Sequence, residues 1–264
     1  MKALFYLLGL FTIITSCQKV IDVDLNDSNL QFVIEANYTA EDSTVRMRMT
    51  KTSSYFDSEP SPFINNAVAT ISDETGNSET LINLGGGNYI LTDYIPNFNS
   101  TYSMSVLNDG VTYTSSTFLP NIVPLNGVTY EFSPGFFSSG EGYFTYLNYN
   151  DPAGVENYYF ALLTRNGYVK NQISNFILSD DQVTDGNTVE RPMFIDSLFE
   201  LGDTVEIELR SVDQNVFEYY DEVQSIAVAG QASAAPANPP KMWSNGAFGY
   251  FAAYGNDRNS VIIE

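Results

Sequence analysis

Short runs of alternating polar and apolar residues, separated by turn residues, are the feature that most constrains the fold of this chain. The clearest case is a hairpin, in which the runs 101–107 and 111–118 flank Asn108-Asp109-Gly110. Asp-Gly accepts the positive φ angles of a tight hairpin turn, and a period of two indicates strands with one buried face. Several such runs fall within residues 30–119, which predicts a compact β-sandwich there.

A proline-bracketed stretch, residues 120–124, predicts an extended linker and therefore a domain boundary. Strand-like runs resume beyond it, so we expect residues 125–264 to form a second β-rich domain. This domain is expected to close with an aromatic strand at 246–253 and a separate apolar strand at 260–263.

One helix is predicted in the second domain, near residues 213–227. Asp213 can accept a hydrogen bond from the first helical turn, and apolar residues recur after it at helical spacing. The predicted fold class is therefore mainly β, with an N-terminal β-sandwich followed by a β-rich domain that carries one helix.

The only cysteine, Cys17, ends a segment that has the layout of an export signal. A short basic start precedes an apolar run at 3–14, which is too short to span a bilayer. Residues 14–17, Ile-Thr-Ser-Cys, are of the types at which lipoprotein signal peptidase cleaves before a lipidated cysteine. The sequence therefore predicts a signal peptide at 1–16, lipidation of Cys17 and a lipidated tether at 17–29. The alternative is an ordinary secretory signal with an incidental cysteine.

Charge and composition exclude several classes of function. The chain has 11 Lys and Arg against 32 Asp and Glu, a formal net charge of −21. This charge repels a phosphate backbone and an anionic bilayer. We therefore expect that the protein does not bind nucleic acid and that it is attached to the membrane through its lipid anchor only. The sequence has no histidine, which removes Ser-His-Asp systems and the commonest zinc ligand. With Cys17 lipidated no thiol remains, and we expect no enzymatic activity.

Carboxylates are the remaining groups for acid–base or metal chemistry. A hydrolase that works through carboxylates alone needs two that face each other at a set separation, and the sequence indicates no such pair. Calcium prefers oxygen ligands, which Asp151 in one polar turn, or Asp180, Asp181 and Asp185 in another, could supply. The spacing is not that of an EF-hand, and ordinary turn chemistry is the leading explanation. No cofactor is expected beyond a structural calcium ion, with Asp151, Asp180 and Asp181 as candidate ligands.

Trp243 and Tyr250 are the candidate ligand-binding aromatics. Loop residues flank Trp243 at 239–240 and 244–246, and aromatic residues on loops are common in recognition sites. Tyr250 lies in the aromatic run that follows, where flat rings could stack on sugars. Core packing explains most aromatics of this chain better, and burial of Trp243 beneath the closing strand is the alternative.

Three pairs of segments carry a resemblance to a known family. They are Cys-Gln-Lys-Val-Ile-Asp-Val-Asp-Leu at 17–25 with Phe-Val-Ile-Glu-Ala at 32–36, Asn-Ala-Val-Ala-Thr-Ile at 66–71 with Gly-Asn-Tyr at 87–89, and Pro-Ala-Asn-Pro at 236–239 with Gly-Ala-Phe-Gly-Tyr-Phe at 246–251. Their order resembles a family of Bacteroidota outer-membrane lipoproteins of unassigned function, a domain of unknown function often encoded beside TonB-dependent receptors. The middle pair resembles a transthyretin-like or carboxypeptidase-regulatory-like sandwich, so we expect the N-terminal sandwich to be Ig-like or transthyretin-like. The resemblance implies a location and a partner, and it carries over no catalytic or ligand-binding residue.

The residues after Cys17 bear on which side of the outer membrane the protein faces. Surface-exposed lipoproteins of the resembling group often carry a lysine or polar residue and then consecutive acidic residues just after the cysteine. Here Val20-Ile21 precede Asp22 and Asp24, so this signal is partial. We expect display on the cell surface, with a periplasmic facing as the alternative.

These observations lead to two functional hypotheses. The first is a non-enzymatic outer-membrane lipoprotein that acts as an accessory or substrate-capture subunit of a TonB-dependent transporter. The second is an adhesion or envelope-assembly component that binds other proteins. The partner is a TonB-dependent receptor in the first case and another envelope protein in the second.

Overall fold

The computed structural model describes residues 30–53, 61–135, 140–193, 197–229 and 238–264. Cys17, the signal peptide and the tether therefore lie outside the described residues. The first eight strands are β1 (Phe32–Thr39), β2 (Thr44–Lys51), β3 (Val68–Asp73), β4 (Ser78–Thr80), β5 (Ile82–Gly85), β6 (Asn88–Leu91), β7 (Ser100–Asn108) and β8 (Val111–Leu119). The remaining elements are β9 (Leu125–Ser133), β10 (Gly142–Asn150), β11 (Tyr158–Arg165), β12 (Tyr168–Val169), η3 (Ile173–Asn175), β13 (Ile177–Asp180), β14 (Thr188–Met193), β15 (Thr204–Val212), α2 (Gln214–Ala229), η5 (Ser244–Gly246) and β16 (Phe248–Ile262).

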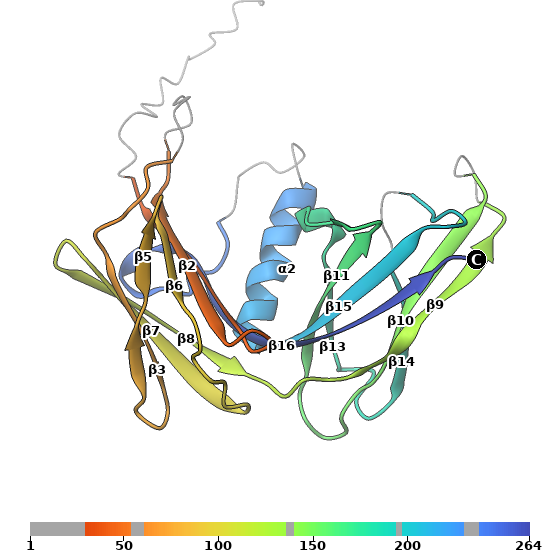
Figure 1. The fold of residues 1–264 in the computed structure, drawn as a ribbon, viewed down its shortest axis with the longest axis horizontal. Helices are drawn as coiled ribbons and strands as arrows, with labels where there is room; N and C mark the ends of the chain where they lie inside the picture. Colours follow the sequence, from red (N-terminus) through yellow and green to blue (C-terminus); the bar gives the residue numbers. More distant parts are fainter. Residues whose placement is uncertain (1–29, 54–60, 136–139, 194–196, 230–237) are drawn as a thin grey trace, which may run out of the picture.

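Two sheets face each other in the N-terminal half of the molecule (Figure 1). One has the strand order β4-β3-β7-β8, and the other contains β5, β6, β2 and β1. Alternation along β1 points Ile34, Ala36 and Tyr38 inward, where they share a core with Tyr102 and Met104 of β7. Each of these five side chains is at most 1% exposed. The prediction of an N-terminal β-sandwich is confirmed.

β16 joins the two halves of the molecule. Its residues 248–254 run parallel to β1, and its residues 255–262 run antiparallel to β15. A nine-stranded sheet therefore passes through both halves (Figure 1). The expectation of two separate closing strands, at 246–253 and 260–263, was wrong. The polar residues between these ranges continue the strand because they are paired with β15.

The proline-bracketed residues 120–124 lie against this sheet. The backbone N–H of Val123 donates to Ser211 Oγ over 3.3 Å, and that of Leu125 donates to Asp257 Oδ2 over 2.8 Å. Val123 is 2% exposed. The linker is thus attached to β15 and β16, and the division of the chain into two domains stays a prediction.

The C-terminal half is a second pair of facing sheets that carries the helix. The sheet β14-β10-β9 shares a core with β11 and β15, to which Tyr159, Ala161 and Leu163 contribute from β11. The alternate residues Phe160 and Leu162 point to the opposite face, where α2 packs. Figure 1 shows α2 in the angle between the two halves. The predicted helix is confirmed.

Candidate functional site

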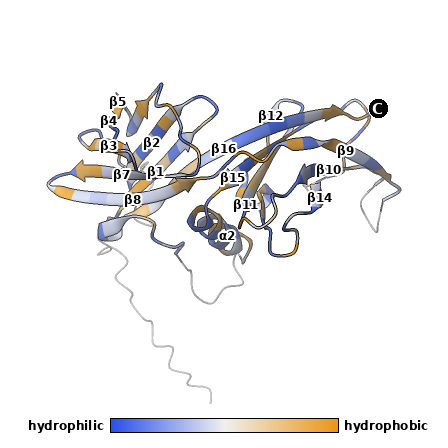
Figure 2. Ribbon diagram, turned by 90° about the horizontal axis from the view of Figure 1, so that it is seen from below, coloured by the Kyte–Doolittle hydropathy of each residue, from blue (hydrophilic) through white to orange (hydrophobic). Residues whose placement is uncertain are grey.

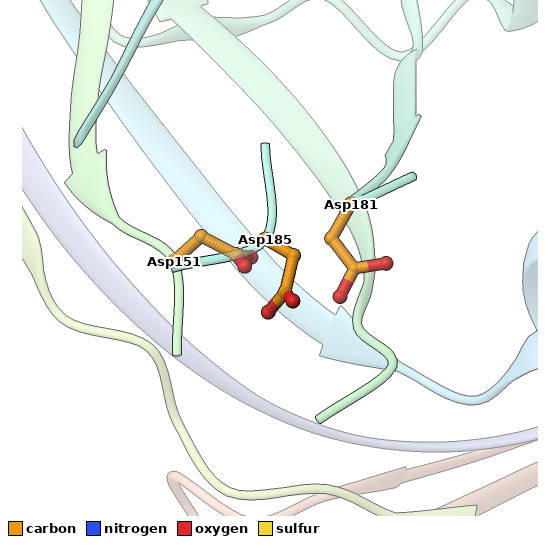
Figure 3. A group of neighbouring side chains, drawn as sticks. All are labelled: Asp151, Asp181 and Asp185. Atoms are coloured by element: carbon orange, nitrogen blue, oxygen red, sulfur yellow. The ribbon is translucent and has the colours of Figure 1, made fainter. Parts of the chain in front are cut away.

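Two of the three candidate calcium ligands, Asp151 and Asp181, gather with Asp185 at one end of the C-terminal sandwich (Figure 3). Asp151 follows β10, Asp181 follows β13, and Asp185 lies in the turn beyond. One carboxylate oxygen from each lies within 4.8 Å of the others. Asp185, rather than Asp180, completes the group, since Asp180 ends β13 while its neighbour Asp181 turns toward Asp151.

Protein donors hold each of these carboxylates in place. Tyr159 Oη donates to Asp151, the backbone N–H of Asn157 donates to Asp181 Oδ2 over 2.8 Å, and that of Gly154 donates to Asp185 Oδ1 over 2.6 Å. Burial raises the pKa of Asp181, and the neighbouring carboxylates add to this effect. Three hard oxygen ligands suit calcium, and the same contacts suit ordinary turns. The calcium ion stays a prediction.

Replacing Asp181 with asparagine tests how much the close approach of the three carboxylates destabilises the folded protein. In EDTA at neutral pH we expect Tm to rise by about 2 °C, because a buried charge near two others is removed. The asparagine Oδ1 can still accept from the Asn157 N–H. Asp180→Asn, outside the group, should leave Tm unchanged. If calcium raises the Tm of the unmodified protein but not that of Asp181→Asn, the calcium prediction is supported. If Asp181→Asn has a lower Tm than the unmodified protein in EDTA, repulsion among the three carboxylates does not destabilise the fold.

Trp243 lies in the core and not on the surface. Its side chain is 3% exposed, and its indole N–H donates to the backbone O of Ile34 over 2.9 Å. Its ring lies 6.3 Å from that of Phe251 on β16. Trp243 therefore offers no open ring face for a ligand, and it connects the loop before β16 to β1.

Trp243→Phe should lower the free energy of unfolding by about 2 kcal/mol, through lost packing and loss of the hydrogen bond from the indole N–H to the Ile34 carbonyl. Urea unfolding followed by circular dichroism measures this loss. The chain has one tryptophan, so blue-shifted emission and weak quenching by iodide would report its burial independently. Red-shifted emission from the folded protein would contradict this placement.

Tyr250 is half-buried between β1 and α2. Its ring lies 5.3 Å from each of the rings of Tyr219 and Tyr220, and its hydroxyl accepts from Asn37 Nδ2 over 3.1 Å. Burial raises the pKa of Tyr250. The structure does not bring Tyr250 and Trp243 together on one open surface, because their contacts lie on opposite faces of the sheet.

The outer face of the sheet β4-β3-β7-β8 is a surface of hydroxyl side chains that the motif analysis missed. The strand register aligns them in two rows, each crossing all four strands. The first row is Thr80, Thr70, Ser105 and Thr114, and the second is Ser78, Ser72, Ser103 and Ser116. We call these two rows the hydroxyl face. Figure 2 shows β8 largely in pale colours of intermediate hydropathy. The signal was the alternation of Ser and Thr within the predicted hairpin.

A groove of about 590 Å³ lies on the hydroxyl face. Its floor includes the outward Ser72, Ser103, Ser105, Thr114 and Ser116, and the buried residues Met104 and Ser115 lie between them on β7 and β8. Its walls are Asn215 and Glu218 in the first turns of α2, and residues 240–242 before β16. The volume falls in the range of small-molecule sites.

Hydrogen bonds connect both walls of the groove to β8, the edge strand of the floor. Ser244 Oγ accepts from the N–H of Thr114 over 2.8 Å, beside residues 240–242. Asp213, at the start of α2, accepts from the N–H of Phe118 over 2.7 Å and from Thr117 Oγ1 over 2.9 Å. These bonds occupy backbone donors at the open edge of β8, so the groove is formed before a ligand arrives.

Facing sheets in both halves, with helix α2 between them, define a mainly β protein of the sandwich class. The chain belongs to the family DUF4249, a domain of unknown function, whose model matches residues 18–260. No curated protein matches the sequence. Among solved structures it is similar to the chicken CNTN1 FN1–FN3 domains, at 7% identity and a TM-score of 0.27, over 68% of this chain and 60% of that one. Within the described residues, no helix combines the length and apolar character needed to cross a bilayer.

Proposed function

We propose that this protein is a non-enzymatic outer-membrane lipoprotein that acts as an accessory or substrate-capture subunit of a TonB-dependent transporter. The observation that carries the capture role is the preformed groove on the hydroxyl face, whose walls are fastened to its floor. Binding sites gain affinity from such rigidity because less conformational freedom is lost on binding.

The sequence supports the location and the absence of catalysis. Cys17, at the end of a short signal, supplies a lipid anchor, and the lack of histidine removes the commonest general base. The transporter as partner rests on the resemblance to lipoproteins encoded beside TonB-dependent receptors. Display on the cell surface is part of this proposal.

Purification of the tagged protein from native membranes in mild detergent tests the partner. We expect an outer-membrane barrel of the TonB-dependent class to co-purify. Repeated recovery of the protein alone would remove the accessory role, and recovery of secretion or assembly machinery would favour the envelope-assembly alternative.

Cys17→Ser tests the anchor. We expect this variant to lose incorporation of labelled palmitate and to leave the membrane fraction, because the thiol that receives the lipid is gone. Protease treatment of intact cells tests the facing: cleavage of the unmodified protein supports surface display, and full protection contradicts it.

A further inference from the structure

We propose that the groove on the hydroxyl face binds an uncharged oligosaccharide, an inference that names the ligand class of the proposed capture role and rests on it. Three features of the groove carry it: the pattern of hydroxyls on its floor, the lack of charge on that floor, and the rigidity of its walls.

The floor repeats one chemical group in two dimensions. Neighbouring strands lie about 4.8 Å apart, and residues two apart on a strand about 6.8 Å, so the two rows form a lattice of hydroxyls. Each Ser or Thr hydroxyl can both donate and accept a hydrogen bond, as can each hydroxyl of a sugar ring. The side-chain hydroxyls of Ser103, Ser105 and Ser116 form no hydrogen bond with another residue that the structure describes. They are available to a ligand.

The floor is uncharged in a strongly acidic protein. At the outward positions of β3, β4, β7 and β8, the residues other than Ser and Thr are Val68, Leu107 and Phe118, which lie near the ends of their strands and outside the two rows. A solvated sheet face in a chain with a net charge of −21 would ordinarily carry Asp or Glu. A neutral floor favours a neutral ligand, because a charged group of the ligand buried against this floor would have no partner and would weaken binding.

The walls add groups that orient a ligand. Asn215 offers an amide, and Glu218, which accepts from Gln214 Nε2 over 2.8 Å, offers a carboxylate held in place. On the other wall, Lys241 lies over the ring of Phe248 at 5.2 Å, beside the apolar Pro240. One negative and one positive side chain leave the walls without net charge, which again selects against ionic ligands.

Isothermal titration calorimetry with defined hexasaccharides tests the inference on the mature full-length protein. The probes are cellohexaose, maltohexaose and xylohexaose, with the charged hexamer of galacturonic acid for comparison. We expect at least one neutral hexamer to bind and the charged hexamer to bind at least tenfold more weakly. Absence of binding by all three neutral hexamers, or equal binding of the charged one, overturns the proposal.

Ser103, at the centre of the floor, is the residue to change. Ser103→Arg should weaken binding of the neutral hexamer at least tenfold by filling the groove, and Ser103→Ala at least threefold by removing one hydroxyl. The matched control is Ser260→Arg, an exposed position in the C-terminal half of β16, which should change affinity less than twofold. Unchanged binding by Ser103→Ala and Ser103→Arg, with circular dichroism showing both folded, overturns the proposal.

The same variants separate the ligand class from the accessory role. If a barrel co-purifies with the protein but no neutral hexamer binds, the ligand class is wrong and the accessory role stands. If Ser103→Arg abolishes co-purification and no hexamer binds, the face docks a protein and the oligosaccharide is overturned. Sugar binding without a co-purifying barrel supports the ligand class and contradicts the proposed role as a subunit of a transporter.

Discussion

Gly249→Ala should lower the free energy of unfolding by about 4 kcal/mol, a large part of the stability of an ordinary domain. Gly249 has a φ of +96°, a conformation that L side chains rarely adopt. A Cβ at this position would also overlap the backbone O of Ile34 and lie 2.7 Å from its carbonyl carbon. Backbone cannot move aside as the end of a side chain can, so the strands must separate.

The damage should reach beyond one contact because Gly249 lies where β16 pairs with β1. Ile34 is its partner in the parallel register, and the Ile34 carbonyl also accepts the indole N–H of Trp243. Separation of the two strands would weaken the sheet that joins both halves of the molecule.

Urea unfolding followed by circular dichroism measures the effect, with Gly76→Ala as the matched control. Gly76 has a φ of +92°, and a Cβ there would meet no atom within 4 Å. The control therefore isolates the strain of the left-handed conformation, which should cost about 1 kcal/mol. Equal losses in the two variants would show that the close approach of β1 and β16 adds nothing.

The strands of this protein could be predicted from local alternation, but the long-range pairing of β16 could not. Val205, Ile207 and Leu209 alternate with acidic residues, and they are buried as that pattern indicates. In contrast, Asn256 to Asn259 read as a polar break between two strands. They continue β16 because β15 pairs with them, and Arg258 is held there by Glu41 and Glu208. Neither partner is close in the sequence.

The candidate sites likewise depend on long-range contacts that local sequence patterns do not predict. The sequence placed acidic residues in two turns, but the group forms from both turns together, with Asp151 from one and Asp181 and Asp185 from the other. The hydroxyls of the floor are visible as alternation in the hairpin 101–118. That the first turns of α2 form a wall beside them depends on tertiary contacts between segments about a hundred residues apart.

Asp213→Ala should lower the free energy of unfolding by about 3 kcal/mol, because Asp213 joins α2 to β8 as well as capping the helix. The capping role was predicted, and Asp213 Oδ1 accepts from the N–H of Val216 over 2.8 Å. The other oxygen accepts from Phe118 N–H and Thr117 Oγ1, and Asp213 is 9% exposed. Loss of the carboxylate removes this partner from the buried Thr117 hydroxyl and from the part-buried Phe118 N–H.

Asp213→Ser separates the two roles. Serine can cap the helix but is too short to reach β8, so we expect it to recover about 1 kcal/mol of the loss, the value of the cap. It should also loosen the groove wall, seen as faster hydrogen exchange at the Phe118 amide. Equal stability of the serine variant and the unmodified protein would show that the bonds to β8 contribute nothing.

The dependence on pH follows from the environment of Asp213. Burial raises its pKa in the folded state, although the bonds from Val216, Phe118 and Thr117 oppose this. A raised pKa means that the folded state binds the proton more tightly than the unfolded state does. The resulting stabilisation is complete below the ordinary pKa of aspartate and is lost as pH rises through the folded-state value. The stability difference between the unmodified protein and Asp213→Ser should therefore increase as pH falls from about 7 to about 4. Urea unfolding at both pH values measures it, and a difference that shrinks over this range would mean that the hydrogen bonds outweigh burial.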